Sequence, residues 1–173
     1  MITNKYVYPE LKRLDKEVGR FYLDSNEISV PSVTTVLTNT SNKSDSIQQW
    51  RNRVGEIEAN RITKQSTDIG SMVHEALENY LNKKDWDNFT NDQEGVIASK
   101  ITEKFINSGL RSLTEVWGLE VGLILDGLYA GTADCTGMIN DIPSIIDFKT
   151  ARRMKKRKSV SYTHLRAHET MLH

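Results

Sequence analysis

The sequence predicts an α+β fold in which an antiparallel meander packs on helices. Apolar residues follow the 3.6-residue period of a helix from about residue 47 to 81 and from 92 to 108, and the two-residue period of strands from about residue 113 to 150. Two turn signals, Asp126-Gly127 and the NDIP segment at 140–143, divide the second part into three strand-like runs. Helices followed by consecutive strands are typical of α+β proteins.

Residues 1–43 are predicted to form a strand-rich lead-in with a short helix. Two β-prone runs, RFYLD at 20–24 and EISV at 27–30, flank a plausible hairpin turn. Pro31 ends the second run, and Ser32 can cap a short helix that follows it. The polar segment 38–46 is predicted to be a loop.

Two helices are predicted after this lead-in. The helical signal from 47 to 81 is clearest near its end, where the residues at helical spacing are Ile69, Met72, Val73, Ala76, Leu77 and Tyr80. After a charged connection, a second helix runs from about 92 to 108. Its expected inward residues are Val96, Ile97, Ile101, Phe105 and Ile106. Asn91 with Glu94 makes a capping pair at its start, and Gly109 is a natural stop.

Three strands are predicted to complete the fold, at 113–125, 128–139 and 144–150. The 173 residues suffice for one domain with its own core. The chain has no apolar run of membrane-spanning length, and its N-terminal sequence has no signal-peptide pattern. The single cysteine, Cys135, excludes a disulfide framework within the chain and a cysteine-ligated iron–sulfur cluster. We therefore expect a cytoplasmic protein with no membrane partner.

The charge balance is neutral, with 23 basic and 23 acidic residues. Many nucleic-acid-binding proteins carry a positive excess, so this balance argues against DNA binding by overall charge. A local stripe can nevertheless supply phosphate contacts. The strongest run comprises Arg152, Arg153, Lys155, Lys156, Arg157 and Lys158. It fits either such a stripe or a solvated stretch.

The C-terminal segment has an unusual sequence. Residues 159–170, SVSYTHLRAHET, resemble the in-frame translation of a transposase adapter used in short-read library preparation. Three of the four histidines lie after Lys158, and the apolar positions there follow no clear period. We therefore expect residues 159–173 to be non-native; a genuine metal-binding histidine tail is the alternative.

Two acidic residues and a lysine are predicted to share one face of the meander. Asp147 and Lys149 alternate with Ile146 and Phe148, which should face the core. Asp134 on the preceding strand can lie opposite Asp147. Two neighbouring carboxylates repel each other unless a cation neutralises them, and Mg²⁺ prefers oxygen ligands. An ordinary surface salt bridge between Asp147 and Lys149 is the alternative.

A stripe on the first helix adds to this pattern. Gly70, His74 and Glu78 follow at four-residue spacing, beside the apolar face. Gly70 would let another backbone approach closely. His74 is a candidate third metal ligand, and Glu78 could orient it or bind a neighbouring basic group. A packed or solvated histidine is the alternative.

Together these motifs resemble the RecB-type branch of the PD-(D/E)XK nucleases. The match runs in order as GxxxHxxxE on a helix, GTAD on a strand and DFKT on the next strand. The stretches PSVTTVL and WRNRVGEIEANRI are further similar to phage exonucleases and to the mitochondrial genome maintenance exonuclease group. The resemblance covers roughly residues 30–156 and implies a restriction-endonuclease-like core over 44–158.

The resemblance implies a divalent metal, Mg²⁺ or else Mn²⁺, as the cofactor. Its implied ligands are His74, Asp134, Asp147 and the backbone carbonyl of Phe148. Lys149 would be the catalytic lysine, and Glu120 is a candidate for a second metal or for holding the water. The candidate DNA contacts are Ser32, Thr35, Arg51, Arg152 and Arg153.

The leading hypothesis is a metal-dependent DNA exonuclease of a phage or bacterial host cell. A nuclease-like DNA-binding module without catalysis and a structure-specific endonuclease or resolvase are the alternatives, and a single-strand-annealing or replication protein is a candidate partner. Oligomeric state stays open. The family's Gln-x-x-x-Tyr element is missing after the DFKT strand, so we expect the core to be truncated, destabilised and weakly active or inactive.

Overall fold

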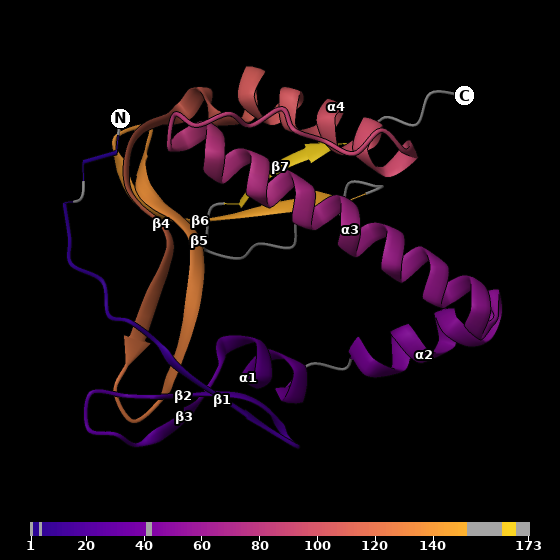
Figure 1. The fold of residues 1–173 in the computed structure, drawn as a ribbon. Helices are drawn as coiled ribbons and strands as arrows, with labels where there is room; N and C mark the ends of the chain where they lie inside the picture. Colours follow the sequence, from indigo (N-terminus) through magenta and orange to yellow (C-terminus); the bar gives the residue numbers. More distant parts are fainter. Residues whose placement is uncertain (1, 4, 41–42, 152–163, 169–173) are drawn as a thin grey trace. The chain divides into compact units, whose positions relative to one another are not determined.

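A computed structural model of the chain describes residues 2–3, 5–40, 43–151 and 164–168 and shows a mixed α+β protein, as the sequence predicts (Figure 1). The elements follow the order β1 (Lys12–Lys16), β2 (Gly19–Leu23), β3 (Ser29–Pro31), α1 (Val33–Thr40), α2 (Lys43–Val54), α3 (Glu56–Leu81), α4 (Gln93–Asn107), the 3-10 helix η1 (Gly109–Ser112), β4 (Leu113–Leu125), β5 (Tyr129–Ile139), β6 (Ile142–Ala151) and β7 (His164–His168). Within this described part of the chain, no helix is long and apolar enough to cross a membrane.

The chain divides into two compact units. The first unit comprises Met1–Tyr6, Thr63–Leu119 and Asp134–His173. The second unit comprises Val7–Ile62 and Glu120–Ala133. The boundary therefore falls within α3, β4 and β5, so each of these elements contributes to both units.

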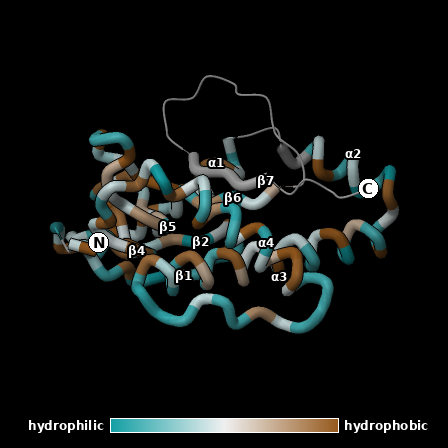
Figure 2. The backbone as a smooth tube through the Cα atoms, turned by 90° about the horizontal axis from the view of Figure 1, so that it is seen from above, coloured by the Kyte–Doolittle hydropathy of each residue, from teal (hydrophilic) through white to brown (hydrophobic). Residues whose placement is uncertain are grey.

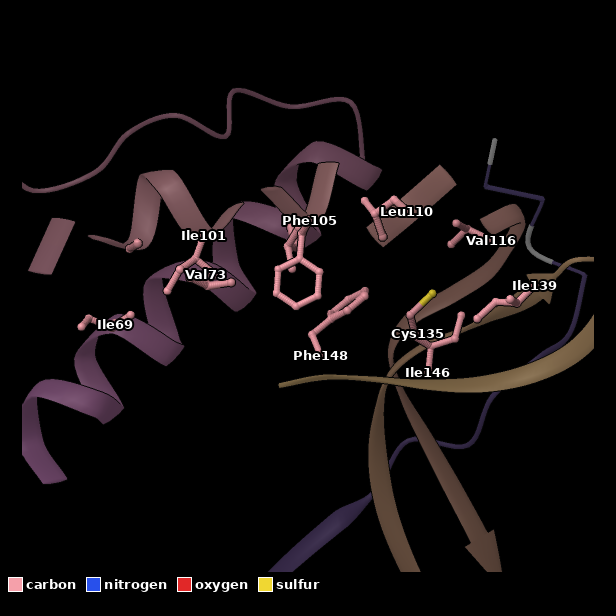
Figure 3. Close-up of a cluster of buried hydrophobic side chains, with 12 residues drawn as sticks. Ile69, Val73, Ile101, Phe105, Leu110, Val116, Cys135, Ile139, Ile146 and Phe148 are labelled. Carbon is pink, nitrogen blue, oxygen red and sulfur yellow. The ribbon is translucent and has the colours of Figure 1, made fainter. Parts of the chain in front are cut away.

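The first unit is built around one hydrophobic core, to which α3, α4 and the strands contribute (Figure 3). Hydrophobic residues recur between hydrophilic ones along both helices, as the brown and teal segments of Figure 2 show. From α3, the core receives Ile69, Val73 and Leu77. From the meander it receives Cys135 and Ile139 of β5 and Ile146 and Phe148 of β6. The predicted helix-on-sheet packing is therefore present in this unit.

The buried faces of the two helices differ in detail from the prediction. Tyr80 and Val96, both expected to face inward, are 37% and 50% exposed. On α4, Ile101 and Phe105 are buried as predicted, and the buried face also includes Ala98 and Thr102.

The start and end of α4 also correct the prediction. Asp92, not Asn91, is the N-cap residue, and its carboxylate accepts the backbone N–H of Gly95 at 2.8 Å. Glu94 is instead held by Gln65 of α3, whose Nε2 lies 2.9 Å from Oε1. The helix does end before Gly109, but the chain then continues into a 3-10 turn.

The sheet of the first unit has the strand order β4-β5-β6-β7. β5 and β6 are antiparallel, with pairs running from Ile139–Ile142 to Cys135–Ile146. Their turn consists of Asn140 and Asp141 alone, both with positive φ (47° and 63°), as a two-residue hairpin requires. β6 therefore begins two residues earlier than predicted.

The backbone of β7 pairs in parallel with β6, with Phe148 aligned to Leu165. This strand lies within the 159–173 segment, for which the sequence predicted no element; the rest of that segment lies outside the described residues.

The second unit contains the sheet β1-β2-β3 and helix α1. Ser32 caps α1 as predicted, because its Oγ accepts the N–H of Thr35 at 3.0 Å. β1 was missed, since its charged residues do not show the alternation of a half-buried strand. The predicted loop at 38–46 was also wrong: α1 continues to Thr40 and α2 begins at Lys43. Gly55, with φ 85°, then separates α2 from α3, where a single helical signal had been read.

Asp24 joins two turns of the second unit. Its carboxylate accepts N–H groups of Asn26 and Ile28 in its own turn, at 2.9 and 2.8 Å, and of Gly127 at 2.9 Å. The carboxylate of Asp126, beside Gly127, accepts hydrogen bonds from the backbone N–H and the hydroxyl of Ser25. Burial alone would raise the pKa of Asp24, but the three backbone donors outweigh it and hold that pKa below its ordinary value.

This lowered pKa predicts a pH dependence of stability. The contribution of ionised Asp24 is complete above its ordinary pKa and is lost as the pH falls through the lower folded pKa. We expect Asp24→Asn to lower the urea midpoint at neutral pH and to approach the wild-type midpoint in strong acid. Asp15→Asn, at a carboxylate that is 67% exposed, is the control. A gap for Asp24→Asn that stays constant with pH would contradict this.

Candidate metal centre

The predicted site residues of the first unit meet at the backbone of Phe148. The Phe148 N–H donates to Oδ2 of Asp134 at 2.7 Å, and the Phe148 carbonyl oxygen lies 2.7 Å from Nε2 of His74. Phe148 belongs to β6, Asp134 to β5 and His74 to α3. The structure therefore brings together three positions that are up to 74 residues apart in the sequence.

The ring of His74 is held with a defined orientation. A carbonyl oxygen only accepts hydrogen bonds, so the contact with Phe148 requires a proton on Nε2. In neutral imidazole the other nitrogen, Nδ1, then carries the lone pair, and it lies 3.6 Å from Oδ2 of Asp134. His74 and Asp134 thus present ligand atoms within one small region, and both side chains are only partly exposed.

Asp134 stands where the β5–β6 ladder ends. The last pair of this ladder is Cys135 with Ile146, the immediate neighbours of Asp134 and Asp147. Beyond that pair the carboxylate of Asp134, not a β5 carbonyl, accepts the N–H of Phe148. Asp134 therefore holds the backbone of β6 at the end of this ladder, in addition to being a candidate metal ligand.

Asp147 and Lys149 show the predicted alternation along β6. Ile146 and Phe148 are buried, at 0% and 2% exposure, while Lys149 projects outward and its Nζ lies 2.7 Å from Oδ1 of Asp147. This pair is partly exposed, so its net contribution to stability is small. The Asp147 carboxylate is therefore neutralised by the lysine in this structure.

The other two residues of the α3 stripe have different surroundings from those expected. A Cβ built on Gly70 would lie 3.7 Å from Oγ1 of Thr150, an ordinary contact with a side chain, so no backbone among the described residues approaches closely enough to require glycine here. Both nitrogens of His74 face Phe148 and Asp134, so the orienting role expected of Glu78 belongs to the Phe148 carbonyl.

Glu120 lies on β4 and is the first residue there that belongs to the second unit. Its φ of 48° places a non-glycine residue in the left-handed region in the middle of a strand. Such conformations are costly and are frequent at functional sites. The sequence did not indicate this strained backbone conformation at Glu120.

The predicted DNA contacts have intramolecular partners where they are described. Ser32 and Thr35 are buried; Thr35 Oγ1 donates to the Arg20 carbonyl at 2.9 Å and accepts the Arg20 N–H at 3.0 Å. Arg51 binds the carboxylate of Glu56 through Nε and Nη2, across the Gly55 break. Arg152 and Arg153 lie outside the described residues. DNA contacts by these residues stay predictions.

Cys135 takes no part in nucleophilic chemistry near neutral pH. Burial, with a smaller effect of the Asp134 charge, raises the pKa of its thiol to about 12. It packs in the core beside the candidate centre.

The sequence did not reveal how Phe105 contributes. Its ring packs edge-on against that of Phe148, with centroids 6.0 Å apart (Figure 3). The only signal in the sequence was its place on the apolar face of α4.

The chain matched no protein-family model and no curated protein.

Proposed function

We propose that this protein is a divalent-metal-dependent DNA exonuclease with a restriction-endonuclease-like core, acting in the cytoplasm of a phage-infected or bacterial cell. The observation that carries the proposal is the convergence of His74 and Asp134 on the backbone of Phe148, directly between Asp147 and Lys149. An ordinary surface salt bridge would need neither the histidine nor the second carboxylate.

The donor set fits a hard or borderline divalent cation. Asp134 offers carboxylate oxygen, which suits Mg²⁺ and Mn²⁺, and His74 offers the Nδ1 lone pair, which favours a transition metal. We therefore propose Mg²⁺ or Mn²⁺, held by His74, Asp134, Asp147 and the backbone carbonyl of Phe148. When bound, such an ion lowers the pKa of a water molecule and polarises the phosphoryl oxygens.

The chain's own groups would then orient the metal ligands and neutralise negative charge. The ammonium of Lys149 lies next to Asp147 and would lie near the scissile phosphate, where its charge stabilises the negative charge of the transition state. Asp147 would hold this ammonium in place. On binding of the cation, part of the Asp147–Lys149 contact would be replaced by a contact between Asp147 and the cation. The Phe148 backbone would keep His74 and Asp134 in register during the reaction.

The test is cleavage of an end-labelled linear duplex under single-turnover conditions, which also detect slow cleavage. With Mg²⁺ or Mn²⁺ added to chelator-treated protein, we expect Lys149→Ala to slow cleavage about 100-fold or more, since removing one charge-stabilising group typically has that effect.

Lys64→Ala is the matched control. Lys64 forms an exposed ion pair with Asp68 at 2.6 Å, much like that of Lys149 with Asp147, but on the surface of α3. We expect no change in its rate. Equal rates for both variants and the wild type would reduce Asp147–Lys149 to a surface salt bridge and contradict the proposal.

The form of the DNA substrate distinguishes an exonuclease from the alternative activities. An exonuclease should degrade the linear duplex and leave a closed circle of the same sequence intact. Cleavage of the circle, or of branched DNA alone, would indicate an endonuclease or resolvase. Metal-independent binding without cleavage would indicate a DNA-binding module.

A further inference from the structure

The sheet β1-β2-β3 of the second unit has one face that packs in a core and one that is partly exposed. Tyr22 of β2 and Val30 of β3, which are paired, are buried together with Ala130. Side chains alternate along a strand, so the neighbours of these residues point to the other face. The residues on that face are all exposed or half-buried, and we call them the β1–β3 face: Lys12, Leu14, Lys16, Phe21, Leu23, Ser29 and Pro31.

Two contacts of Lys16 confirm that these side chains share one face. Its ammonium lies 4.4 Å from the centroid of the Phe21 ring and donates to Oγ of Ser29 at 2.7 Å. Lys16 therefore extends across the ring. Lys12 and Lys16 stand on either side of Leu14, the partner of Phe21, at a spacing of about 7 Å along β1. A lysine thus lies on each side of the row that holds the ring.

The β1–β3 face carries positive charge without a counter-charge. Lys12 and Lys16 are its charged residues, and within the described part of the chain neither forms an ion pair with a carboxylate. Arg13, on the opposite face of β1, is instead paired with Asp15 at 2.8 Å. Charged residues also keep an edge strand such as β1 from pairing with another chain. That role would explain the lysines but not the half-buried aromatic ring beside them.

We propose that the β1–β3 face binds a single strand of DNA, with Phe21 as the stacking surface for a base and Lys12 and Lys16 as phosphate contacts. Aromatic rings combined with positive charge are what proteins use to bind single strands. In a duplex each base is already stacked between its neighbours, so only an unpaired strand can use the ring. This inference rests on the proposed function, because it names the form of DNA that the exonuclease would hold.

Stacking of a base requires the Lys16 ammonium to leave the Phe21 ring. An exposed cation–π contact is weaker than the stack of a base on an aromatic ring. A phosphate would replace the hydroxyl of Ser29 as the partner of the ammonium, and its negative charge attracts the ammonium more strongly. Both exchanges therefore favour the bound strand.

The test is the binding of a fluorescein-labelled oligothymidine of about 16 nucleotides, a length that single-strand-binding domains cover. Fluorescence anisotropy of the full chain is measured over a series of salt concentrations, with EDTA present so that no cleavage occurs. We expect the double variant Lys12→Gln, Lys16→Gln to reduce the slope of log K against log salt by about 1.4, since each phosphate contact contributes about 0.7. We expect Phe21→Leu to weaken Kd about 5-fold or more, because stacking on the ring is lost.

Arg13→Gln is the matched control, because it removes a positive charge from the same strand on the opposite face. We expect it to leave the slope unchanged. Phe21→Tyr keeps the ring and should retain most of the affinity that Phe21→Leu loses, which separates loss of stacking from loss of folding. A double lysine variant with the wild-type slope would overturn the proposal and leave the lysines as protection of an edge strand.

Competition identifies the class of ligand. Unlabelled oligothymidine should displace the labelled strand at lower concentrations than a duplex of the same length or a polyglutamate of matched charge. Equal displacement by the duplex would overturn the preference for an unpaired strand. Equal displacement by polyglutamate would indicate a site for acidic protein segments and would also overturn the proposal.

Failure of this inference can be distinguished from failure of the proposed function. If the variants of the β1–β3 face weaken binding in EDTA but the wild type cleaves no DNA with Mg²⁺ or Mn²⁺, the face stands and the proposed exonuclease fails. If Lys149→Ala slows cleavage but the variants of the face bind the oligothymidine as the wild type does, the inference about the face alone is overturned.

Discussion

Replacing Gly95 with alanine is expected to destabilise the protein by about 3 kcal/mol, the upper range for an added methyl group in a packed site. A Cβ at this position would overlap the Thr90 carbonyl oxygen and would lie 2.6 Å from Thr90 Oγ1. The same hydroxyl donates to Asp92 Oδ1 at 2.7 Å, and Asp92 caps α4. Relief of the clash would therefore also disturb the cap.

The helix preference of alanine opposes this effect but is smaller. Alanine is favoured over glycine inside a helix by about 0.5–1 kcal/mol. The steric cost at Gly95 exceeds this gain, because the obstructing atom is backbone and cannot rotate away. Urea denaturation at neutral pH measures the difference.

Gly70→Ala is the matched control on α3. Among the residues that the structure describes, its Cβ would meet only Thr150 Oγ1, at 3.7 Å, so the helix preference should prevail and raise stability by about 0.5–1 kcal/mol. Opposite signs at the two glycines are the expected result. Equal effects at both positions would contradict the packing described for α4.

Replacing Asp134 with alanine is expected to reduce metal-dependent cleavage by at least about 100-fold and also to lower stability. The activity is lost because a ligand of the proposed centre is removed. Stability falls by about 1–3 kcal/mol, the cost of leaving a buried hydrogen-bond donor without its acceptor. That donor is the N–H of Phe148.

Asp134→Asn separates the two effects. Its amide oxygen can still accept the Phe148 N–H, so most of the stability should be retained, while the charge needed for the cation is gone. We expect near wild-type urea midpoints with cleavage as slow as in the alanine variant. Full activity of Asp134→Asn would show that Asp134 is only a structural cap of the β5–β6 ladder.

Much of the candidate site could be predicted from local patterns. Alternation along β6 places Asp147 and Lys149 opposite the buried Ile146 and Phe148, because successive strand residues point to opposite faces. The same reasoning gave the class of fold, since a change of period from 3.6 to two needs only short stretches of sequence.

Errors arose where a local pattern had two readings. The continuous helical signal from residue 47 did not show that Gly55 interrupts it, and β1 carries too many charged residues to be recognised as a strand. On α4, the apolar pattern predicted Val96 for the core, whereas Ala98 and Thr102 are buried. Such choices depend on the partner surface, which the sequence does not display.

The sequence by itself determined the residue types of the candidate centre and their places on helix and strand, because these follow from periodicity and turn chemistry. Only the tertiary structure decided how they are held together. The engagement of both Phe148 peptide groups, by His74 and Asp134, requires β5 to leave the ladder at Cys135 and the Phe148 ring to pack on Phe105. These contacts join residues far apart in the chain through backbone atoms, which every residue possesses. The motifs could therefore imply that these residues meet, but not which of their atoms bond to one another.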